Sequence, residues 1–310
     1  MNILIIDAFP SNFIDQLSQM PVTYTFIPEA DRAEVLEKIP EAEILILNSK
    51  IRVTKEVVDM APKLKMVIRA GVGMDHIDVE YLESKGVIVL NTKGGNADSV
   101  GEQTIGTLLA LQHKIVRANS MVKQFIWERP SNRGIEIGGK TMGIIGYGNT
   151  GQALARKLDG FDMEVIAYDK YREDYEDDHA EEVSMEEIFK RSDFVSLHVP
   201  LTEETHHLVN RKFIDSFAKP FVLLNLSRGP VVELPALLEG LESRKILAAG
   251  IDVLENEKFD QLTEVQRENY AKLFSYENVI VTPHVGGWSY ESLENINNMI
   301  LAFVSALIED

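Results

Sequence analysis

The sequence predicts an α/β protein with two Rossmann-like domains, each built on a doubly wound parallel sheet. Short apolar segments alternate with helix-like segments along the whole chain, without a visible short repeat. The 310 residues, 45% of them hydrophobic, are long for one domain and sufficient for two cores. A third observation is a glycine-rich turn between a strand and a helix near the middle of the chain, which indicates one complete βαβ unit.

Five apolar segments, separated by helix-like stretches such as 32–39 and 55–60, predict the sheet of the first domain. They are short and rich in Ile, Leu and Val, as buried parallel strands are. The first of them lacks a basic flank and is too short for a signal peptide or a membrane span, so we interpret it as a strand. The predicted strands are 3–7, 24–27, 44–47, 66–69 and 87–91.

The segments that follow predict how the domains connect. Residues 99–119 are helix-compatible and lead into the irregular segment 124–139, so we interpret 99–119 as the crossing between the domains. The second domain then runs from Thr141 to about Pro283. The tail 289–310 has apolar residues at helical spacing, and we expect this helix to pack back on the first domain. Its apolar positions include Ile296, Ile300, Phe303, Val304 and Leu307.

The glycine-rich turn joins an apolar strand at 141–145 to a helix-like segment at 152–158, and a second strand follows at 163–168. In such a unit the first glycine makes a tight turn and the second lets backbone N–H groups approach a pyrophosphate. The third glycine lets helix and strand pack closely. This context favours a dinucleotide site over a glycine-rich loop of another α/β protein. The three glycines are Gly146, Gly148 and Gly151.

Asp169 ends the second strand of this unit, 18 residues after Gly151. A carboxylate at that place accepts hydrogen bonds from the adenosine ribose diol and repels a 2′-phosphate. The sequence therefore predicts NAD as the cofactor. The nearby cations Lys170 and Arg172 leave NADP open, because a 2′-phosphate would need such groups.

Composition limits the partners. The net charge of −18, from 49 acidic and 31 basic residues, disfavours nucleic acid and anionic membranes, and we expect neither as a partner of this cytoplasmic protein. The absence of cysteine excludes disulfides, thiolate chemistry and Cys-ligated metals. We interpret the acidic run 172–182 as a solvated loop and assign no metal to it. A small anionic substrate would need a local group of arginines.

Three polar residues lie in segments at the ends of predicted strands, where open α/β sheets place their ligands. Arg228 follows the strand 221–226, and its planar guanidinium suits a carboxylate. Glu257 lies in the segment 250–257, and His284 follows the strand 278–282 behind a stiffening proline. Each alone has an ordinary structural interpretation. Together they indicate a site.

Reduction of a 2-oxo acid by a nicotinamide needs a proton for the carbonyl oxygen and a cation for the carboxylate. His284 can donate the proton as a general acid, and remove it in the reverse direction. Glu257, hydrogen-bonded to His284, would hold the ring and favour its protonated form. Arg228 would anchor the carboxylate and polarise the carbonyl.

Taken together, these motifs resemble the D-isomer-specific 2-hydroxyacid dehydrogenases over nearly the whole chain. The resemblance implies that the Arg, Glu and His just named are the catalytic residues. It also implies a substrate domain at 1–97 plus 287–310, an NAD-binding domain at 98–286, a cleft between the two, and a homodimer formed through the nucleotide domains. The motifs are the glycine pattern with Asp169, Ser-Arg228-Gly, Asp252-Val-x-Glu-x-Glu257 and Thr-Pro-His284-x-Gly-Gly287.

The resemblance also implies binding residues. The loop 67–75 is most similar to that of the D-3-phosphoglycerate dehydrogenases, whose backbone amides hold the substrate carboxylate. For Arg69, a salt bridge with Asp75 or another acid is the alternative. The implied substrate residues are Arg52 and Arg69 for a phosphate, Val72 and Gly73 for the carboxylate, Asn96, and Arg228. The implied cofactor residues, besides the three glycines and Asp169, are Asn149, Thr150, Val199, Pro200, Leu226, Asp252, Gly287 and Thr104.

Two features depart from the family pattern. Lys258 stands after Glu257 where a proline is common, and the insertion-like stretch 259–275 follows. Glu255 is a competitor for the acidic role, although the spacing from Arg228 favours Glu257. The sequence also ends at residue 310 without the regulatory domain of many D-3-phosphoglycerate dehydrogenases, so we expect no serine feedback through such a domain.

The preferred reaction is the interconversion of 3-phosphoglycerate and 3-phosphohydroxypyruvate, EC 1.1.1.95, in serine biosynthesis. Glycerate or hydroxypyruvate, glyoxylate and D-lactate remain alternatives, because the same three catalytic residues would serve them. A different class of protein also remains open. Transcriptional corepressors share this fold and a similar Arg, Glu and His, and they would bind NAD without robust turnover of any 2-oxo acid.

Overall fold

The computed structural model describes residues 1–309, and the chain divides into two compact units. The first comprises 1–96 and 290–310, and the second comprises Ala97–Ser289. Each unit is built on a sheet whose strand pairs are all parallel, with five strands in the first and seven in the second. The predicted fold class, two doubly wound parallel-sheet domains, is confirmed.

In the first unit the strands lie in the order β2-β1-β3-β4-β5, so the order reverses beside β1. Buried side chains cover both faces of this sheet, as is required of an all-parallel sheet. The strands are β1 (Asn2–Ile5), β2 (Thr23–Phe26), β3 (Ile44–Leu47), β4 (Met66–Arg69) and β5 (Ile88–Asn91). The helices are α1 (Ser11–Ser18), α2 (Arg32–Lys38), the 3-10 turn η1 (Ile39–Glu41), α3 (Lys55–Asp59), α4 (Val79–Ser84) and α12 (Tyr290–Glu309).

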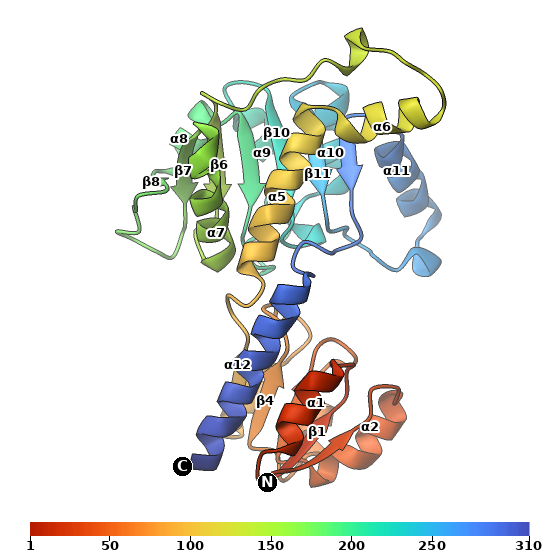
Figure 1. Cartoon of the computed structure of the whole chain (residues 1–310), viewed down its shortest axis with the longest axis vertical. Helices are drawn as coiled ribbons and strands as arrows, with labels where there is room; N and C mark the ends of the chain where they lie inside the picture. The colour runs from red at the N-terminus through yellow and green to blue at the C-terminus, as the bar shows by residue number, and fades with distance from the viewer. Residues whose placement is uncertain (310) are drawn as a thin grey trace. The chain divides into compact units, whose positions relative to one another are not determined.

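Helix α12 returns to the first unit from the far end of the chain (Figure 1). Its side chains Ile296, Ile300 and Val304 are buried in one cluster with Ile3 and Phe13. These three are spaced so that they share one helix face, which is why the pattern was legible in the sequence.

The second unit has the strand order β12-β11-β10-β9-β6-β7-β8. The order reverses between β6 and β9, and this switch point is where doubly wound sheets bind nucleotides. The strands are β6 (Thr141–Ile145), β7 (Glu164–Tyr168), β8 (Glu181–Glu182), β9 (Phe194–Leu197), β10 (Phe221–Asn225), β11 (Ile246–Ile251) and β12 (Val279–Val281).

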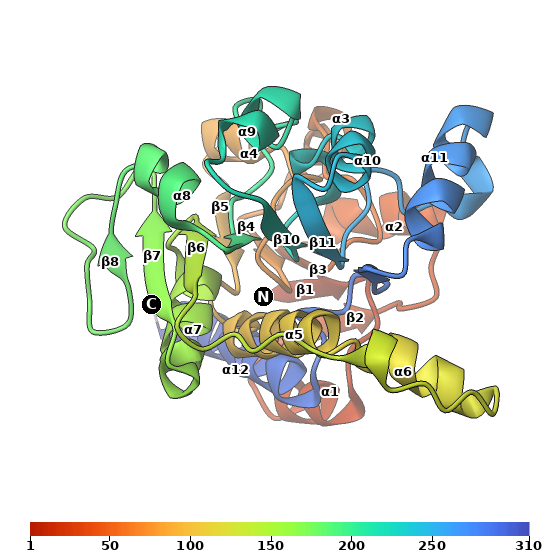
Figure 2. The same ribbon diagram turned by 90° about the horizontal axis from the view of Figure 1, so that it is seen from above.

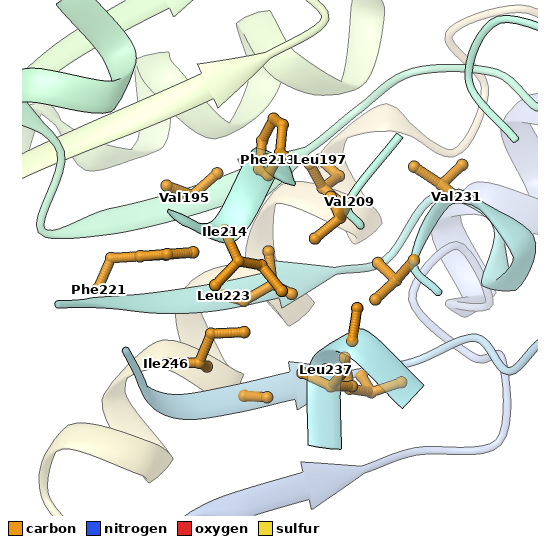
Figure 3. Packing of buried hydrophobic residues seen from close by; sticks show 14 of the residues in the cluster. Val195, Leu197, Val209, Phe213, Ile214, Phe221, Leu223, Val231, Leu237 and Ile246 are labelled. Carbon is orange, nitrogen blue, oxygen red and sulfur yellow. The ribbon is translucent and has the colours of Figure 1, made fainter. Parts of the chain in front are cut away.

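Helices cover both faces of the second sheet. Figure 3 shows part of the core on one face, where Phe213, Ile214 and Leu237 from two helices meet Val195 and Leu223 of the strands. The helices are α5 (Ala97–Gln112), α6 (Ile115–Lys123), α7 (Asn149–Leu158), α8 (Met185–Arg191), α9 (Arg211–Ser216), α10 (Leu234–Glu242) and α11 (Glu264–Ser275). The 3-10 turns are η2 (Pro130–Asn132), η3 (Asp159–Phe161), η4 (Gly229–Val231) and η5 (Phe259–Gln261). Of the described helices, none is both long and apolar enough to span a membrane.

One expectation about local structure was wrong. The segment 99–119 is not one helix that crosses between the domains. The helix is interrupted at Lys114, whose φ of 52° is left-handed, and the two resulting helices, α5 and α6, both belong to the second unit. Most residues of the acidic run 172–182 are exposed, as expected, but two of its residues contact the rest of the second unit. Tyr175 is 6% exposed, and the Asp177 carboxylate accepts a hydrogen bond from the buried Tyr147 hydroxyl at 2.9 Å. Tyr175 and Asp177 therefore tie an otherwise exposed acidic segment to the second unit.

Candidate active site

The glycine turn lies between β6 and α7 at the switch point of the second sheet. Gly146 has a φ of +94°, and an added Cβ would lie 2.7 Å from the carbonyl oxygen of His198. A Cβ on Gly151 would lie 2.3 Å from the carbonyl oxygen of Gly146. At Gly148, by contrast, an added Cβ would meet no atom within 4 Å, so this side of the turn is open. The turn therefore packs closely against the protein at Gly146 and Gly151 and leaves space for a ligand at Gly148.

The residues of this turn fit the pyrophosphate of a dinucleotide. Helix α7 begins at Asn149 without a side-chain cap, so its first backbone N–H groups are available to an anion. The hydroxyl of Thr150 is hydrogen-bonded to Nδ1 of His198 at 3.1 Å, and Nε2 of that ring lies 2.8 Å from the Ser196 hydroxyl. Burial lowers the pKa of His198 to about 4, which keeps the ring neutral near pH 7.

Asp169 is held at the end of β7 by two backbone donors. Its carboxylate accepts from the N–H of Tyr147 at 2.8 Å and from the N–H of Tyr171 at 3.0 Å. Each oxygen keeps acceptor capacity, so the group fits a ribose diol. The two neighbouring cations have other partners, since Lys170 pairs with Glu204 at 2.6 Å and Arg172 donates to the carbonyl of Tyr147. This arrangement fits the predicted choice of NAD.

His284 lies on the loop after β12 with a left-handed backbone, at a φ of 56°. Few residues without a glycine's freedom adopt this conformation, so the surroundings must hold it. Asp252 does this from the end of β11: its carboxylate accepts from Val285 N–H at 3.0 Å and Gly286 N–H at 2.7 Å. Its carbonyl accepts from His284 N–H at 2.8 Å, and the Thr282 hydroxyl donates to the same carboxylate.

The side chain of His284 meets that of Glu257. Nδ1 of the ring lies 2.9 Å and 3.0 Å from the two carboxylate oxygens. Partial burial raises the pKa of Glu257, but the hydrogen bond and charge of His284 and the charge of Arg228 outweigh it and hold the pKa below its ordinary value. Glu255 is engaged elsewhere, because it accepts from Leu234 N–H at 2.9 Å and pairs with His207 at 3.3 Å. The expected pair, Glu257 with His284, is therefore the one that forms.

Arg228 is brought to this group by a close backbone contact. The residue after it, Gly229, packs so tightly that an added Cβ would lie 1.9 Å from the carbonyl oxygen of Leu254, three residues before Glu257. The guanidinium donates to the Ser227 carbonyl at 2.8 Å, and Asn225 donates to the Arg228 carbonyl at 3.0 Å. The turn after β10 is thus joined to the loop after β11.

The first unit contains the other predicted substrate residues. The guanidinium of Arg69 lies against Gly71, where an added Cβ would be 1.2 Å from Nη1. The Val72–Gly73 segment is held by Asn91, whose side chain donates to the Val72 carbonyl at 2.8 Å. Arg52 is exposed and lines a pocket of about 450 Å³ with Lys55, His76 and the acids Asp75 and Asp78. The amide oxygen of Asn96 is buried without a hydrogen-bond partner within the described residues.

The remaining predicted cofactor residues differ in their surroundings. Thr104 is fully buried within α5, and its hydroxyl donates to the Val100 carbonyl at 2.7 Å. Val199 is half-buried and Pro200 exposed after β9, while Leu226 is 8% exposed beside Gly286. Gly287 continues the His284 loop. Asp252, expected at the nicotinamide, is 3% exposed, and its carboxylate supports the His284 loop.

Several contributors to the site were missed in the sequence. Ser99 of α5 donates to the Gly286 carbonyl at 2.8 Å and so fastens the His284 loop from another side. Thr282 and Asn91 stabilise loops in the same manner. For Thr282 and Asn91, the only signal in the sequence was their position at a strand end, because hydroxyl and amide side chains there commonly form hydrogen bonds with neighbouring backbone.

The second unit, with its open glycine turn and an imidazole–carboxylate pair at the same sheet edge, has the construction of a nicotinamide-dependent oxidoreductase. A family model described as "D-isomer specific 2-hydroxyacid dehydrogenase, NAD binding domain" matches residues 105–286. The chain belongs to this family.

Curated relatives and solved structures agree with that assignment. The chain is 40% identical to a hydroxypyruvate reductase of Thermotoga maritima over 86% of this chain and 85% of that protein. It is 40% identical to a D-3-phosphoglycerate dehydrogenase of Methanocaldococcus jannaschii over 84% of this chain, and that match spans 49% of the longer relative. A D-lactate dehydrogenase of Aquifex aeolicus, solved with NAD and lactic acid, superposes with a TM-score of 0.85 at 29% identity, covering 99% and 96% of the two chains.

Proposed function

We propose that this protein transfers a hydride between NAD and a small D-2-hydroxy acid or the corresponding 2-oxo acid, with 3-phosphoglycerate and 3-phosphohydroxypyruvate as the preferred pair. The observation that carries the reaction is the contact of Glu257 with Nδ1 of His284. It leaves Nε2 as the ring nitrogen for the substrate oxygen. In the same proposal the enzyme works in the cytoplasm, in serine synthesis.

Each residue of the site has a chemical role in this proposal. When bound, reduced NAD supplies the hydride for the carbonyl carbon. His284 donates its Nε2 proton to the carbonyl oxygen as the alcohol forms, and takes it back in the reverse direction. Glu257 stabilises the imidazolium that must exist before that donation, and Arg228 holds the substrate carboxylate with its two-pronged guanidinium.

The cofactor roles rest on the geometry of the glycine turn. We assign the pyrophosphate to the N–H groups of Asn149 and Thr150 at the start of α7, and the ribose diol to Asp169. Val199 and Pro200 would flank the adenine. Leu226 and Gly287 would lie beside the nicotinamide and its ribose.

The preference for a phosphorylated acid is supported by cations of the first unit. Arg69 lies against the segment whose Val72 and Gly73 N–H groups we assign to the substrate carboxylate, and Arg52 faces a pocket beside Lys55. Guanidinium groups bind phosphate by paired, charge-assisted hydrogen bonds. A second candidate, hydroxypyruvate, is favoured by the Thermotoga maritima relative, which matches this chain over 85% of its own length.

A panel of 2-oxo acids tests the substrate. We expect kcat/KM with NADH to be at least about tenfold higher for 3-phosphohydroxypyruvate than for hydroxypyruvate, pyruvate or glyoxylate, because one charge-assisted contact to phosphate contributes that much. Arg69→Gln should remove the difference, whereas the matched control Arg211→Gln, on the exposed surface of α9, should retain it.

Other results of this panel identify the alternatives. The panel could instead show a preference for hydroxypyruvate that Arg69→Gln leaves unchanged. That result would indicate that Arg69 and Arg52 have structural roles and do not bind phosphate. Tight NADH binding without turnover of any acid would favour a binding protein of the corepressor kind. That last outcome would overturn the enzymatic proposal altogether.

We also propose a homodimer formed through the second unit. Helix α6 has no buried residue, and Figure 2 shows it extending away from the sheet of its own unit. A groove of about 1080 Å³ lies beside it, lined by residues of α5, α6 and β11. We call residues 115–127, which comprise α6 and the residues that follow it, the apolar arm. In a two-fold dimer the apolar arm of each copy would cover the groove of the other. The exposed apolar residues of the arm are Ile115, Val116, Val122, Phe125, Ile126 and Trp127.

Negative charge introduced on this arm should dissociate the proposed dimer. Phe125 is 99% and Trp127 82% exposed, so replacing both with Asp removes little contact within the chain. We expect light scattering to give the mass of one chain for the double variant and of two chains for the wild type. Val265→Asp, an exposed apolar position on α11, should remain a dimer. A wild-type protein that is monomeric at micromolar concentration would contradict the proposal.

A further inference from the structure

Glu257 lies on a loop that has no regular structure of its own. Residues 252–258 connect β11 to η5, and the carboxylate of Glu257 reaches His284 from the exposed end of this loop. A hydrogen-bonded pair with both side chains 45% exposed is weak unless the backbone that carries it is already ordered. The residues immediately before Glu257 therefore decide how well the pair is formed.

Two sets of contacts hold those residues. Glu255 is fixed by Leu234 N–H and by His207, as described above. Asn256 is fixed by Tyr270, whose hydroxyl accepts from Asn256 N–H at 2.9 Å and donates to the Asn256 carbonyl at 3.3 Å. The Asn256 side chain in turn accepts from Lys258 N–H at 3.0 Å, which closes a turn around Glu257.

Tyr270 is well placed to act as a fixed point. It is 2% exposed within the core of the second unit, and burial raises the pKa of its hydroxyl, so the proton remains available for donation. Its ring stacks on Phe274 at a centroid distance of 5.9 Å and lies 6.2 Å from Phe259. It belongs to α11, which starts at a capping box formed by Thr263 and Gln266.

We propose that Tyr270 is a positioning residue of the active site, which holds the backbone of Asn256 so that Glu257 faces His284. The insertion-like stretch 259–275 thereby orders the loop through α11, at the place where Lys258 stands instead of a stiffening proline. The inference rests on the proposed function, because it assigns Tyr270 a part in the proton transfer of His284.

Tyr270→Phe tests this inference, because it keeps the buried ring and removes only the hydroxyl. With the 2-oxo acid preferred in the panel, we expect kcat to fall about tenfold, while the KM of the acid and the dissociation constant of NADH stay within about twofold of wild type. Arg228 and the glycine turn, which bind these ligands, are untouched. Tyr276→Phe is the matched control, since that hydroxyl has no hydrogen bond within the described residues.

The pH profile gives a second kinetic readout. The pKa of Glu257 is held below its ordinary value, so its carboxylate is ionised at neutral pH and becomes protonated as pH falls through that lowered pKa. Loosening the loop moves the pKa of Glu257 back up. The acid limb of kcat should therefore shift to higher pH in Tyr270→Phe. In a Glu257→Gln background, Tyr270→Phe should add no further loss.

A ligand-free measurement separates this inference from the proposed function. The imidazole ¹⁵N signals of His284, assigned with His284→Ala, should move in Tyr270→Phe in the direction in which Glu257→Gln moves them. This shift is readable even if the protein reduces no 2-oxo acid. Unchanged imidazole signals in a folded Tyr270→Phe protein would overturn the inference, and so would an equal fall of kcat with and without Glu257.

Discussion

Replacing His284 with alanine is expected to lower kcat for the 2-oxo acid by about 10³-fold, because general acid catalysis by a positioned imidazole contributes about 10²- to 10⁴-fold. The NADH dissociation constant should stay within about twofold of wild type, since the groups assigned to the pyrophosphate and the ribose diol follow β6 and β7, whereas His284 lies in the loop after β12. Stopped-flow turnover and quenching of tryptophan fluorescence by NADH measure the two quantities.

The left-handed backbone of His284 requires a second variant. His284→Asn cannot donate a proton to the substrate, but asparagine tolerates a φ of 56° better than alanine does. Both variants should lose the same turnover, whereas the exposed control His113→Ala should lose none. Loss of NADH binding together with turnover in both variants would indicate a collapsed loop and contradict the role assigned to His284.

The second large effect is expected at Gly229. An added methyl group would lie 1.9 Å from the carbonyl oxygen and 2.0 Å from the carbonyl carbon of Leu254, so backbone must move on one side or the other. We expect Gly229→Ala to lower the free energy of unfolding by about 3 kcal/mol, at the upper end for overpacked sites. Because the displaced segments carry Arg228 and Glu257, kcat/KM should fall by more than tenfold as well.

Gly106→Ala is the matched control for this substitution. Gly106 lies inside α5, where an added Cβ meets no atom within 4 Å, so alanine should stabilise the helix by about 0.5 to 1 kcal/mol. In urea unfolding, the free energy of unfolding should be lower than wild type for Gly229→Ala and higher than wild type for Gly106→Ala. A Gly229→Ala protein with wild-type stability and activity would mean that the turn after β10 and the loop after β11 are not in contact.

Much of the second unit was legible in the sequence because its signals are local. The strand, turn and helix around Gly146 are consecutive, and each glycine answers a need created by its immediate neighbours. Asp169 follows at the distance that one helix and one strand require. The apolar face of α12 could likewise be read from helical spacing at Ile296 and Ile300.

The sequence was less informative where its composition or periodicity does not decide the local structure. The helical pattern through 99–119 continues across Lys114, whose left-handed backbone breaks the helix. Asp177 lies in an acidic run, and only the approach of the Tyr147 hydroxyl gives it a buried partner.

The sequence by itself determined the fold class, the nucleotide turn and the three residue types of the candidate site, because periodicity, glycine spacing and the positions of strand ends are local properties of the chain. The tertiary structure alone decided that Glu255 is held by Leu234 and His207, that Asp252 holds the His284 loop, and that Tyr270 reaches Asn256. These are contacts between side chains and loops from different elements. Their partners are selected by packing in three dimensions, which no short segment encodes.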